Sequence, residues 1–346
     1  MTDMTWPDVL GRITRRDNLS DDEVRWAMGQ ILAGEAADAQ IAGFAIGLRM
    51  KGETVDEMTA IIDAMLEFSE RVEVEGVVVD TCGTGGDRSG SINVSTMSAL
   101  VVAGAGVRVA KHGNRAASSA CGSADLLEHL GVAIDIGPAD VARCIRDASI
   151  GFCFAPRFHP ALRFAGPVRR ALGVPTLFNF LGPLANPAGV RRQALGVSDS
   201  AMAMRMAGVL ERRGAERALV FYGHDGLDEL TTTTESTVVE LRDGELRTYQ
   251  IDPTELGFPT VGDDELKGGD AAHNAAIARR VLAGEAGPAR DITLLNAAAA
   301  LVVADAAPSL VEGVELAAAS VDEGRAAAAL DRLVAASNRS LDGEAA

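Results

Sequence analysis

Aromatic residues are scarce in this sequence. They make up 4% of the 346 residues, whereas hydrophobic residues together make up 47%. The core must therefore be filled mainly by Ala, Val, Leu and Ile, a mixture that suits parallel strands covered by helices. The length is sufficient to bury a large core and favours two structural lobes.

Positive charge is also in deficit, with 32 Lys and Arg against 49 Asp and Glu and a formal net charge of −17. A surface this acidic repels phosphodiester backbones, which argues against nucleic acid as a partner. An anionic substrate would have to be met by a local positive site. The candidates for that site are Lys111, Arg115, Arg169 and a bound metal ion.

The sequence contains few cysteines, and neither a signal-peptide pattern nor a long apolar run is evident in it. The four cysteines lack the Cys-x-x-Cys spacing of redox motifs and zinc sites, so we expect reduced, mostly buried thiols. Residues 1–6 show neither the basic nor the apolar region of a signal peptide. No run approaches the length of a membrane span. The sequence predicts a soluble, cytoplasmic protein without a membrane partner.

The first 70 residues predict a small lobe made only of helices. Ser20 with Glu23, and Thr54 with Glu57, have the spacing of a capping box, in which each side chain bonds the other residue's backbone N–H. Apolar residues follow each pair at helical intervals. No strand pattern interrupts this region.

From about residue 74 the pattern changes to alternating strands and helices, which is typical of a sheet flanked by helices. The expected fold class is α/β, with a small all-helical N-terminal lobe and a large α/β lobe whose central sheet is mostly parallel. Residues 176–187 are punctuated by Pro and Gly and have the character of a hinge. The expected division is a helical lobe of residues 1–72 plus approximately 170–195, and an α/β lobe of residues 73–169 and 196–346.

Hydrophobic periodicity and turn residues give the individual segments. Strands are predicted at 77–79, 107–110, 151–154 and 218–222, and a hairpin at 237–241 and 246–251. Helices are predicted at 138–148, 201–213, 271–282, 294–304 and 314–335.

A glycine-rich loop, Asp80 to Asp87, follows the first predicted strand. Asn93, Ser95 and Thr96 then begin a helix a few residues further on. Glycines let backbone N–H groups approach phosphate oxygens closely, and a helix N-terminus adds its dipole. A tight turn and simple helix capping are the alternative interpretations. Three such groups beside a glycine loop exceed what capping requires, which favours a phosphate site.

A second polar stretch follows the next predicted strand. Lys111 supplies a point charge, Asn114 an amide and Arg115 a fork of N–H groups for phosphate. His112 is as compatible with a structural role as with a functional one. Ligands of open α/β sheets bind beyond the carboxyl ends of the strands, so we expect this stretch and the glycine loop to meet there.

Asp228 and Glu229 form an adjacent carboxylate pair in a loop after a predicted strand. In a protein this acidic, such pairs are usually solvated surface. Mg²⁺, however, is commonly held by one or two carboxylates together with phosphates. A polyphosphate site needs such a pair, which makes these residues candidate metal ligands.

In combination, these motifs resemble those of anthranilate phosphoribosyltransferases, enzymes of the tryptophan pathway. The specific part is Asp-x-x-Gly-Thr-Gly-Gly-Asp followed by Lys-His-Gly-Asn-Arg-x-x-Ser-Ser-x-x-Gly-Ser-x-Asp. With the helical N-terminal region, the resemblance covers most of the chain. It runs through residues 80–132, 159–170, 178–187 and 226–233.

The resemblance implies a reaction in which the amine of anthranilate attacks C1 of phosphoribosyl pyrophosphate (PRPP) and releases pyrophosphate. It also implies a helical lobe hinged to an α/β lobe, dependence on Mg²⁺ with two ions per subunit, and a homodimer formed through the helical lobe.

The resemblance further implies roles for individual residues, carried over position by position. The catalytic residues would be Lys111, His112 and Arg169, and the Mg²⁺ ligands Ser95, Asp228 and Glu229. Anthranilate would contact Gly83, Asn114, His159 and Arg169. PRPP would contact Gly83, Gly86, Asp87, Ser91, Asn93, Val94, Ser95, Thr96, Lys111, His112, Gly113, Asn114, Arg115, Ala116, Ala117, Ser118, Ser119 and Ser123.

Two positions add detail to this expectation. Leu162 stands where some relatives have an aromatic residue, which puts an aromatic contact there in question. Arg88, beside the glycine loop, is expected to be solvent-exposed.

The expected chemistry needs no strong base, because the amine of an aniline is already unprotonated at pH 7. The work is positioning, together with neutralising pyrophosphate as it leaves an oxocarbenium-like centre. Lys111 and Mg²⁺ would neutralise the pyrophosphate, and Arg169 would offer the aromatic carboxylate a bidentate partner. We expect no covalent intermediate and no nucleophilic side chain.

Two other functions are compatible with parts of the sequence. Pyrimidine-nucleoside phosphorylases share this fold and a Lys-His phosphate loop, but not the Asn-Arg-x-x-Ser-Ser that follows Lys-His-Gly here. A non-catalytic relative that binds nucleic acid should be basic, whereas this chain is acidic and keeps Asp228 and Glu229. Phosphate-dependent cleavage of thymidine, or a retarded DNA band, would distinguish these alternatives.

Overall fold

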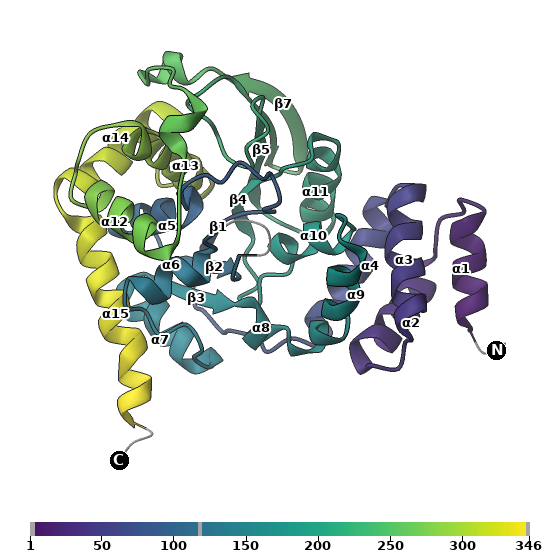
Figure 1. The fold of residues 1–346 in the computed structure, drawn as a ribbon. Helices are drawn as coiled ribbons and strands as arrows, with labels where there is room; N and C mark the ends of the chain where they lie inside the picture. The colour runs from purple at the N-terminus through teal and green to yellow at the C-terminus, as the bar shows by residue number, and fades with distance from the viewer. Residues whose placement is uncertain (1–3, 117–119, 344–346) are drawn as a thin grey trace.

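The computed structural model describes residues 4–116 and 120–343, and its N-terminal part is a bundle of helices (Figure 1). Both predicted capping boxes are present, at Ser20 and Thr54, and each begins a helix. The helical N-terminal lobe is therefore confirmed. Its helices are α1 (Trp6–Thr14), α2 (Asp21–Ala33), α3 (Asp38–Lys51) and α4 (Val55–Glu67).

The rest of the chain is built around one sheet with the strand order β3-β2-β1-β4-β5-β6-β7. Strands β1 to β5 are parallel, and β6 and β7 join by antiparallel pairing. The predicted α/β fold and mostly parallel sheet are confirmed. The strands are β1 (Val79–Gly83), β2 (Val109–Gly113), β3 (Ile150–Phe154), β4 (Arg192–Gly196), β5 (Arg217–Gly223), β6 (Ser236–Arg242) and β7 (Glu245–Ile251).

The predicted hairpin is also confirmed, as β6 and β7. Its turn residues Asp243 and Gly244 have φ values of 55° and 75°. Two successive left-handed residues are what a tight hairpin turn requires, because they match the twist of the strands.

Helices cover both faces of the sheet (Figure 1). One face of the sheet packs against α11 (Ser200–Arg212) and the N-terminal helices, and a larger layer of helices, the main layer, covers the opposite face. Successive side chains of a strand point to opposite faces of the sheet, so in β4 Ala194 lies in the core on one face and Leu195 in the core on the other. The main layer contains α5 (Val94–Gly104), α7 (Pro138–Ala148), α12 (Ala271–Leu282), α13 (Pro288–Val303), α14 (Leu310–Asp322) and α15 (Arg325–Gly343).

Short helices make the connections. The chain leaves β3, contacts the helical lobe where α9 packs against α3, and returns to β4. None of the helices in residues 4–116 and 120–343 is both long and apolar enough to cross a membrane. The connecting helices are α6 (Ser123–His129), α8 (Ala155–Phe158), α9 (Gly166–Leu172) and α10 (Phe178–Leu181), with 3₁₀ turns η1 (Pro160–Phe164), η2 (Gly182–Leu184), η3 (Pro253–Leu256) and η4 (Asp263–Leu266).

Some predicted boundaries are wrong. Strands β1 and β2 run on to Gly83 and Gly113, because polar side chains there are hydrogen-bonded inside the sheet rather than exposed in loops. The predicted helix at 314–335 is two helices, separated at Gly324, whose φ is 73°. Strand β4 is missing from the predicted strands, because Gln193 interrupts its apolar pattern. The division into lobes stays a prediction.

Candidate active site

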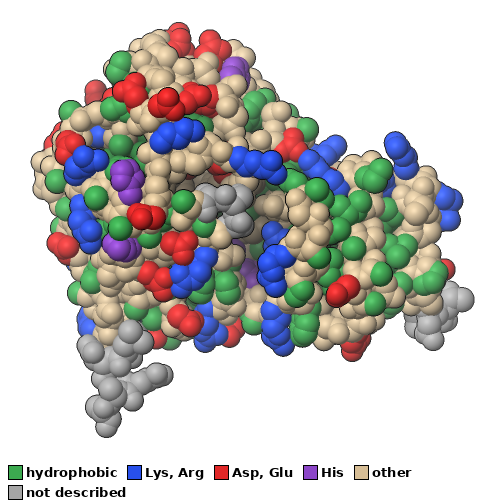
Figure 2. All heavy atoms as spheres, in the orientation of Figure 1, with side chains coloured by type: hydrophobic (Ala, Val, Ile, Leu, Met, Phe, Trp, Pro, Cys, Tyr) green, Lys and Arg blue, Asp and Glu red, His purple; other side chains and the backbone are tan. Residues whose placement is uncertain are grey.

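The loops that follow β1 and β5 meet at the carboxyl edge of the sheet. The N–H of Thr84 donates to the carbonyl of Gly196 over 3.0 Å, and the N–H of Gly85 donates to Asp228 Oδ2 over 2.7 Å. Figure 2 shows a hollow on this side of the molecule, with Lys and Arg side chains around it. Parallel strands end at one edge of a sheet, so residues distant in the sequence converge here, as predicted.

The acidic pair lies inside this edge and is not solvated surface. Asp228 and Glu229 are 9% and 8% exposed. Glu229 Oε1 accepts a hydrogen bond from the N–H of Ser95 over 3.2 Å, in the first turn of α5. Burial, and then the charge of Asp87, raise the pKa of Asp228 to about 7, and burial with the neighbouring Asp228 raises the pKa of Glu229. Buried carboxylates in this state favour a bound cation.

The loop after β5 that carries Asp228 and Glu229, called the acidic loop below, leaves room only for glycine at two neighbouring strand ends. A Cβ on Gly83 would lie 2.2 Å from Asp228 Oδ2, and a Cβ on Gly196 would lie 1.7 Å from the Asp228 carbonyl oxygen. The strands β1 and β4 therefore end in glycine because the acidic loop crosses directly over them. Gly83, predicted to touch both substrates, is in contact with a predicted metal ligand.

Asp225 holds the acidic loop in shape. Its carboxylate accepts hydrogen bonds from Thr231 Oγ1 over 2.6 Å and from the N–H of Leu227 over 3.0 Å, on either side of the acidic pair. The predicted donor set for Mg²⁺ is two buried carboxylates and the hydroxyl of Ser95. Oxygen ligands of this kind fit a hard divalent cation.

The predicted PRPP residues after the glycine loop are placed in different ways. Asp87 Oδ2 and Thr96 Oγ1 are buried and have no hydrogen-bond partner among the described residues, so they can bind a ligand. Ser91 pairs with Lys267 in an isolated bridge. Val94 points into the core and its N–H donates to Ile92, so its side chain serves packing. Gly86 adopts a φ of 82°, which suits a loop that exposes its amides.

Lys111 lies within β2 and is 1% exposed. Its ammonium donates to the carbonyl of Thr81 over 2.7 Å and to Ser95 Oγ over 3.2 Å. Burial lowers the pKa of Lys111, and the charges of Asp80, Cys82 and Glu229 oppose that effect. The lysine therefore sits directly behind a predicted metal ligand, in a sheet rather than in an open loop.

The two histidines lie together, with ring centroids 5.3 Å apart. His112 Nδ1 bonds the carbonyl of Gly182 over 2.9 Å, and His159 Nε2 bonds the carbonyl of Ala185 over 2.8 Å. A carbonyl can only accept, so each of these nitrogens carries the hydrogen and the other nitrogen of each ring is a bare acceptor. Both bare nitrogens, His112 Nε2 and His159 Nδ1, are buried without a partner in the described parts of the chain.

Electrostatics keeps these rings neutral. Burial, and then the neighbouring His159, lower the pKa of His112 to about 3, and burial also lowers the pKa of His159. A buried, neutral ring with an unused acceptor is suited to bind a donor, and a functional role for His112 stays a prediction.

Arg169, in α9, is half-buried and lies over the ring of Phe178, with Cζ 5.9 Å from the ring centroid. Burial lowers its pKa. Among the described residues no carboxylate pairs with it, whereas its neighbour Arg170 is exposed. A half-buried guanidinium without a counter-ion is a ready partner for an anionic ligand.

The loop after β2 is held by Asp125. Its carboxylate accepts from the N–H of Ala116 over 3.0 Å and from the N–H of Gly122 over 2.8 Å. Arg115, predicted to fork a phosphate, instead pairs with Asp125 and with Glu128, which raise its pKa. The predicted PRPP residues Ala117, Ser118 and Ser119 lie outside the described residues.

The remaining predicted substrate-binding residues after β2 contact one another. Ser123 Oγ donates to the carbonyl of Asn114 over 3.2 Å, and a Cβ on Gly113 would lie 2.2 Å from Ser123 Oγ. Asn114 Oδ1 accepts from the N–H of Arg115 over 2.7 Å. The structure therefore brings Gly113, Asn114 and Ser123 to the same edge of the sheet.

Sequence reasoning missed the segment before α12. The N–H of Gly268 donates to the carbonyl of Gly90 over 2.8 Å, and Asn274 Nδ2 donates to Asn93 Oδ1 over 2.8 Å. Asn93 in turn donates to the carbonyl of Cys121 over 3.0 Å, so its side chain already has protein partners on both sides. The adjacent glycines 268 and 269, next to the N-cap Asp270, were the available signal of a closely packed loop.

Two remaining predictions concern the surroundings. Arg88 is exposed, as predicted, and has a left-handed φ of 59°. Leu162 lies half-buried in η1 and packs against the core of the helical lobe.

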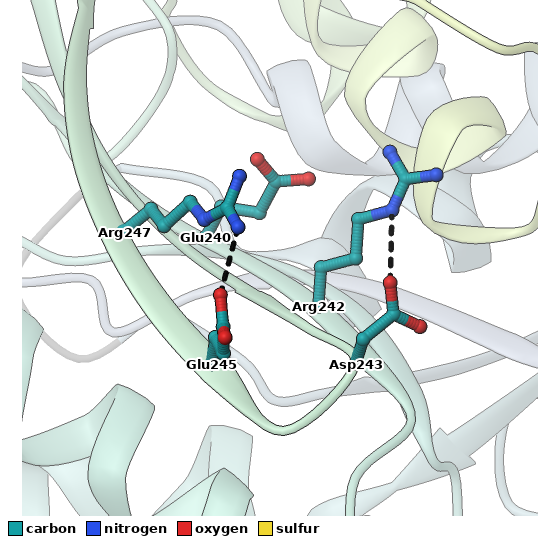
Figure 3. Close-up of a pocket in the computed structure, with 5 residues that line it drawn as sticks. All are labelled: Glu240, Arg242, Asp243, Glu245 and Arg247. Atoms are coloured by element: carbon teal, nitrogen blue, oxygen red, sulfur yellow. Dashed lines mark hydrogen bonds and ion pairs between the residues drawn. The ribbon is translucent and has the colours of Figure 1, made fainter.

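A separate hollow lies on the β6–β7 hairpin (Figure 3). Exposed ion pairs line it, with Arg247 paired to Glu245 over 2.7 Å and Arg242 to Asp243 over 3.6 Å. These charges satisfy one another, in contrast to the unpaired Arg169.

Comparison with known proteins identifies this architecture. Residues 7–69 match the helical bundle domain, and residues 75–327 the a/b domain, of the glycosyl transferase family. The anthranilate phosphoribosyltransferase of Nocardioides sp. is 55% identical over 340 residues, which cover 97% of this chain and 99% of that protein.

Solved structures agree with this match. The anthranilate phosphoribosyltransferase from Thermus thermophilus is 44% identical, with a TM-score of 0.90 over 95% of this chain and 99% of that one. The enzyme from Saccharomyces cerevisiae, in complex with PRPP and Mg, is 26% identical, with a TM-score of 0.89 over 98% and 99%.

The fold and the site define a glycosyltransferase with a helical bundle and an α/β domain. Within that class, the chain belongs to the anthranilate phosphoribosyltransferase family. The resemblance first drawn from the motifs is confirmed.

Proposed function

We propose that this protein transfers the 5-phosphoribosyl group of PRPP to the amine of anthranilate, giving N-(5-phosphoribosyl)anthranilate and pyrophosphate in tryptophan biosynthesis. One observation carries the proposal: the buried carboxylates Asp228 and Glu229 are hydrogen-bonded to the glycine loop and to the first turn of α5. That arrangement suits a magnesium polyphosphate, and the relatives named above share the whole architecture.

The PRPP half of the site lies at the glycine loop. Backbone amides of the loop and of the start of α5 would bind the phosphates of PRPP, and the oxygens of Asp87 and Thr96 have no hydrogen-bond partner among the described residues. Ser95, Asp228 and Glu229 would hold Mg²⁺, which when bound neutralises the charge of the departing pyrophosphate. Lys111 holds Ser95 from behind and adds positive charge under the same oxygens.

The acceptor half lies between the histidines and α9. Arg169 offers two N–H groups to the anthranilate carboxylate, and the bare nitrogens of His112 and His159 can accept from its amine. Gly83 ends β1 and Asn114 follows β2, and both would contact anthranilate between the two halves. In this proposal the amine nitrogen is oriented toward C1 of the ribose.

The reaction is a direct displacement. The amine nitrogen forms a bond to C1 as the bond from C1 to the pyrophosphate oxygen breaks, and the nitrogen then loses a proton. A protonated secondary arylamine is a strong acid, so the weakly basic His112 Nε2 suffices as the acceptor of that proton. No side chain needs to act as a nucleophile, and the main contributions are positioning and charge stabilisation.

The first experiment follows the loss of anthranilate fluorescence with PRPP and Mg²⁺. We expect rapid, Mg²⁺-dependent turnover by the wild type and a rise of about 100-fold in the anthranilate KM of Arg169→Ala, because a charge-assisted bidentate pair is lost. Arg170→Ala, which removes an exposed neighbouring charge, is the matched control and should resemble the wild type. Absence of turnover by folded wild type would contradict the function, and an unchanged KM in Arg169→Ala would contradict the acceptor site.

Three further properties are part of the proposal. Each subunit binds two Mg²⁺ ions, which calorimetric titration in the presence of PRPP would count. The protein is a homodimer through the helical lobe, where Met50 is 73% exposed, and light scattering of wild type and Met50→Glu would test this. The protein acts in the cytoplasm.

A further inference from the structure

Strands β1 and β2 are paired through their backbones at Val79 and Val109, near their amino ends. Beyond that point, hydrogen bonds of side chains replace the backbone hydrogen bonds between β1 and β2. The ammonium of Lys111 donates to the carbonyl of Thr81 over 2.7 Å, and the N–H of His112 donates to Asp80 Oδ1 over 3.2 Å. On the side facing β1, the reacting end of β2 is therefore held by side chains, whereas on its other side β2 keeps a regular ladder with β3.

Asp80 is the centre of this arrangement and is completely buried. Besides His112, its carboxylate binds the side chain of Asn186, whose Nδ2 lies 2.8 Å from Asp80 Oδ2. The same amide group of Asn186 donates to the carbonyl of Ala110 over 2.8 Å. Asn186 thus bridges the two separated strands, and neither it nor Asp80 has a place among the substrate contacts.

Asn186 ends the segment Gly182–Asn186, whose backbone carbonyls accept hydrogen bonds from side chains of the candidate site. The carbonyls of Gly182 and Ala185 accept from His112 and His159, and the carbonyl of Pro183 accepts from Gln193 Nε2 over 2.7 Å. These bonds decide which nitrogen of each ring carries its hydrogen. The position of the segment therefore sets the direction of the two bare nitrogens.

We propose that Asp80 is a positioning residue of the reaction: through Asn186 it fixes the Gly182–Asn186 segment against β2 and so aims the bare nitrogens of His112 and His159 at the anthranilate amine. This inference rests on the proposed function. Asp80 is fully buried, and its carboxylate accepts hydrogen bonds from the N–H of His112 and from the side chain of Asn186.

A purely structural role is the competing explanation, in which Asp80 stabilises the fold or balances the charge of Lys111. The two explanations differ in kinetics. Misaimed acceptor nitrogens lower kcat and leave PRPP binding intact, whereas a damaged fold lowers the melting temperature and the amount of active protein. A misplacement of about 1 Å can reduce the rate about 100-fold.

Asn186→Ala is the main test, because it keeps both Asp80 and Lys111. We expect kcat to fall about 100-fold, with the KM for PRPP within about threefold of wild type. Ser320→Ala is the matched control, since it removes an equally buried hydrogen bond, to the carbonyl of Val101, far from the site. A kcat within threefold of wild type in folded Asn186→Ala would overturn the proposal.

Asp80→Asn supplies the second arm, because Asn has one acceptor oxygen in place of two and must give up the bond from either the N–H of His112 or Asn186 Nδ2. If Asp80 acts through Asn186, the double variant with Asn186→Ala should be no slower than the slower single variant. Multiplied effects on kcat would overturn the proposal. If Asp80→Asn does not fold, Asn186→Ala decides alone, and inactive wild type would instead refute the proposed function.

Discussion

The amide of Gly85 donates a hydrogen bond to Asp228 Oδ2 over 2.7 Å, which joins the glycine loop to the acidic loop across the carboxyl edge of the sheet. The shape of one loop therefore depends on the other. A substitution in the glycine loop should therefore displace the predicted metal ligands first.

Gly83→Ala should abolish most activity. The new Cβ would lie 2.2 Å from Asp228 Oδ2, so the acidic pair must move. We expect kcat/KM to fall at least about 100-fold and half-saturation by Mg²⁺ to rise, both measured by anthranilate fluorescence. Gly29→Ala is the control, because a Cβ there meets nothing within 4 Å and Ala favours the helix. Wild-type kinetics in Gly83→Ala would contradict the prediction.

His112 should make the protein less stable in acid, a contribution opposite in sign to that of Asp228, whose raised pKa favours the folded state as the pH falls. The pKa of His112 falls from 6.5 to about 3 on folding, because the ring is buried. Below pH 6.5 the unfolded chain binds a proton that the folded protein refuses, so this contribution is lost as the pH drops toward 3. Between pH 7 and pH 5 the loss amounts to about 2 kcal/mol.

Urea unfolding at the two pH values measures this loss. His112→Gln should lose less stability on going from pH 7 to pH 5, whereas exposed His129→Gln should behave as wild type. Equal pH dependence in wild type and His112→Gln would refute the assignment. For the same reason, kcat should show no inflection from His112 between pH 5 and pH 8.

Asp125→Ala should weaken PRPP binding without slowing chemistry. Asp125 Oδ2 accepts hydrogen bonds from the amides of both Ala116 and Gly122. An Ala side chain has no acceptor oxygen, so both amides lose their partner. We expect the KM for PRPP to rise about tenfold with kcat within about twofold. Glu128→Gln, which alters only an exposed ion pair, is the control, and an equal KM in both variants would contradict the prediction.

Asn274→Ala should also raise the KM for PRPP, by about tenfold, because Asn93 and the N–H of Gly269 both lose a hydrogen bond to it. The neighbouring His273→Ala, at an exposed position of α12, is the control. Steady-state kinetics with varied PRPP measures the effect. Parallel behaviour of the two variants would show that the segment before α12 has no part in the site.

Much of this protein could be predicted without coordinates, because local signals agreed with the fold. The capping residues Ser20 and Thr54 begin real helices, and Asp243 and Gly244 form the hairpin turn. Strand ends carrying Gly83 and Gly113 meet at one edge, since parallel strands allow no other arrangement. Strand β4 was missed because Gln193 serves a long-range hydrogen bond, to the carbonyl of Pro183, that no local pattern contains.

The sequence by itself determined the class of fold, the family and the residue types at the site, because these depend on periodicity, capping and short motifs. Only the tertiary structure decided which groups Asp80, Lys111 and Arg115 contact. Asp80 and Lys111 are buried between β1 and β2, and Arg115 is paired with acidic side chains. Such contacts depend on which groups of distant segments meet with water excluded, and burial and pairing of that kind leave no trace in local sequence.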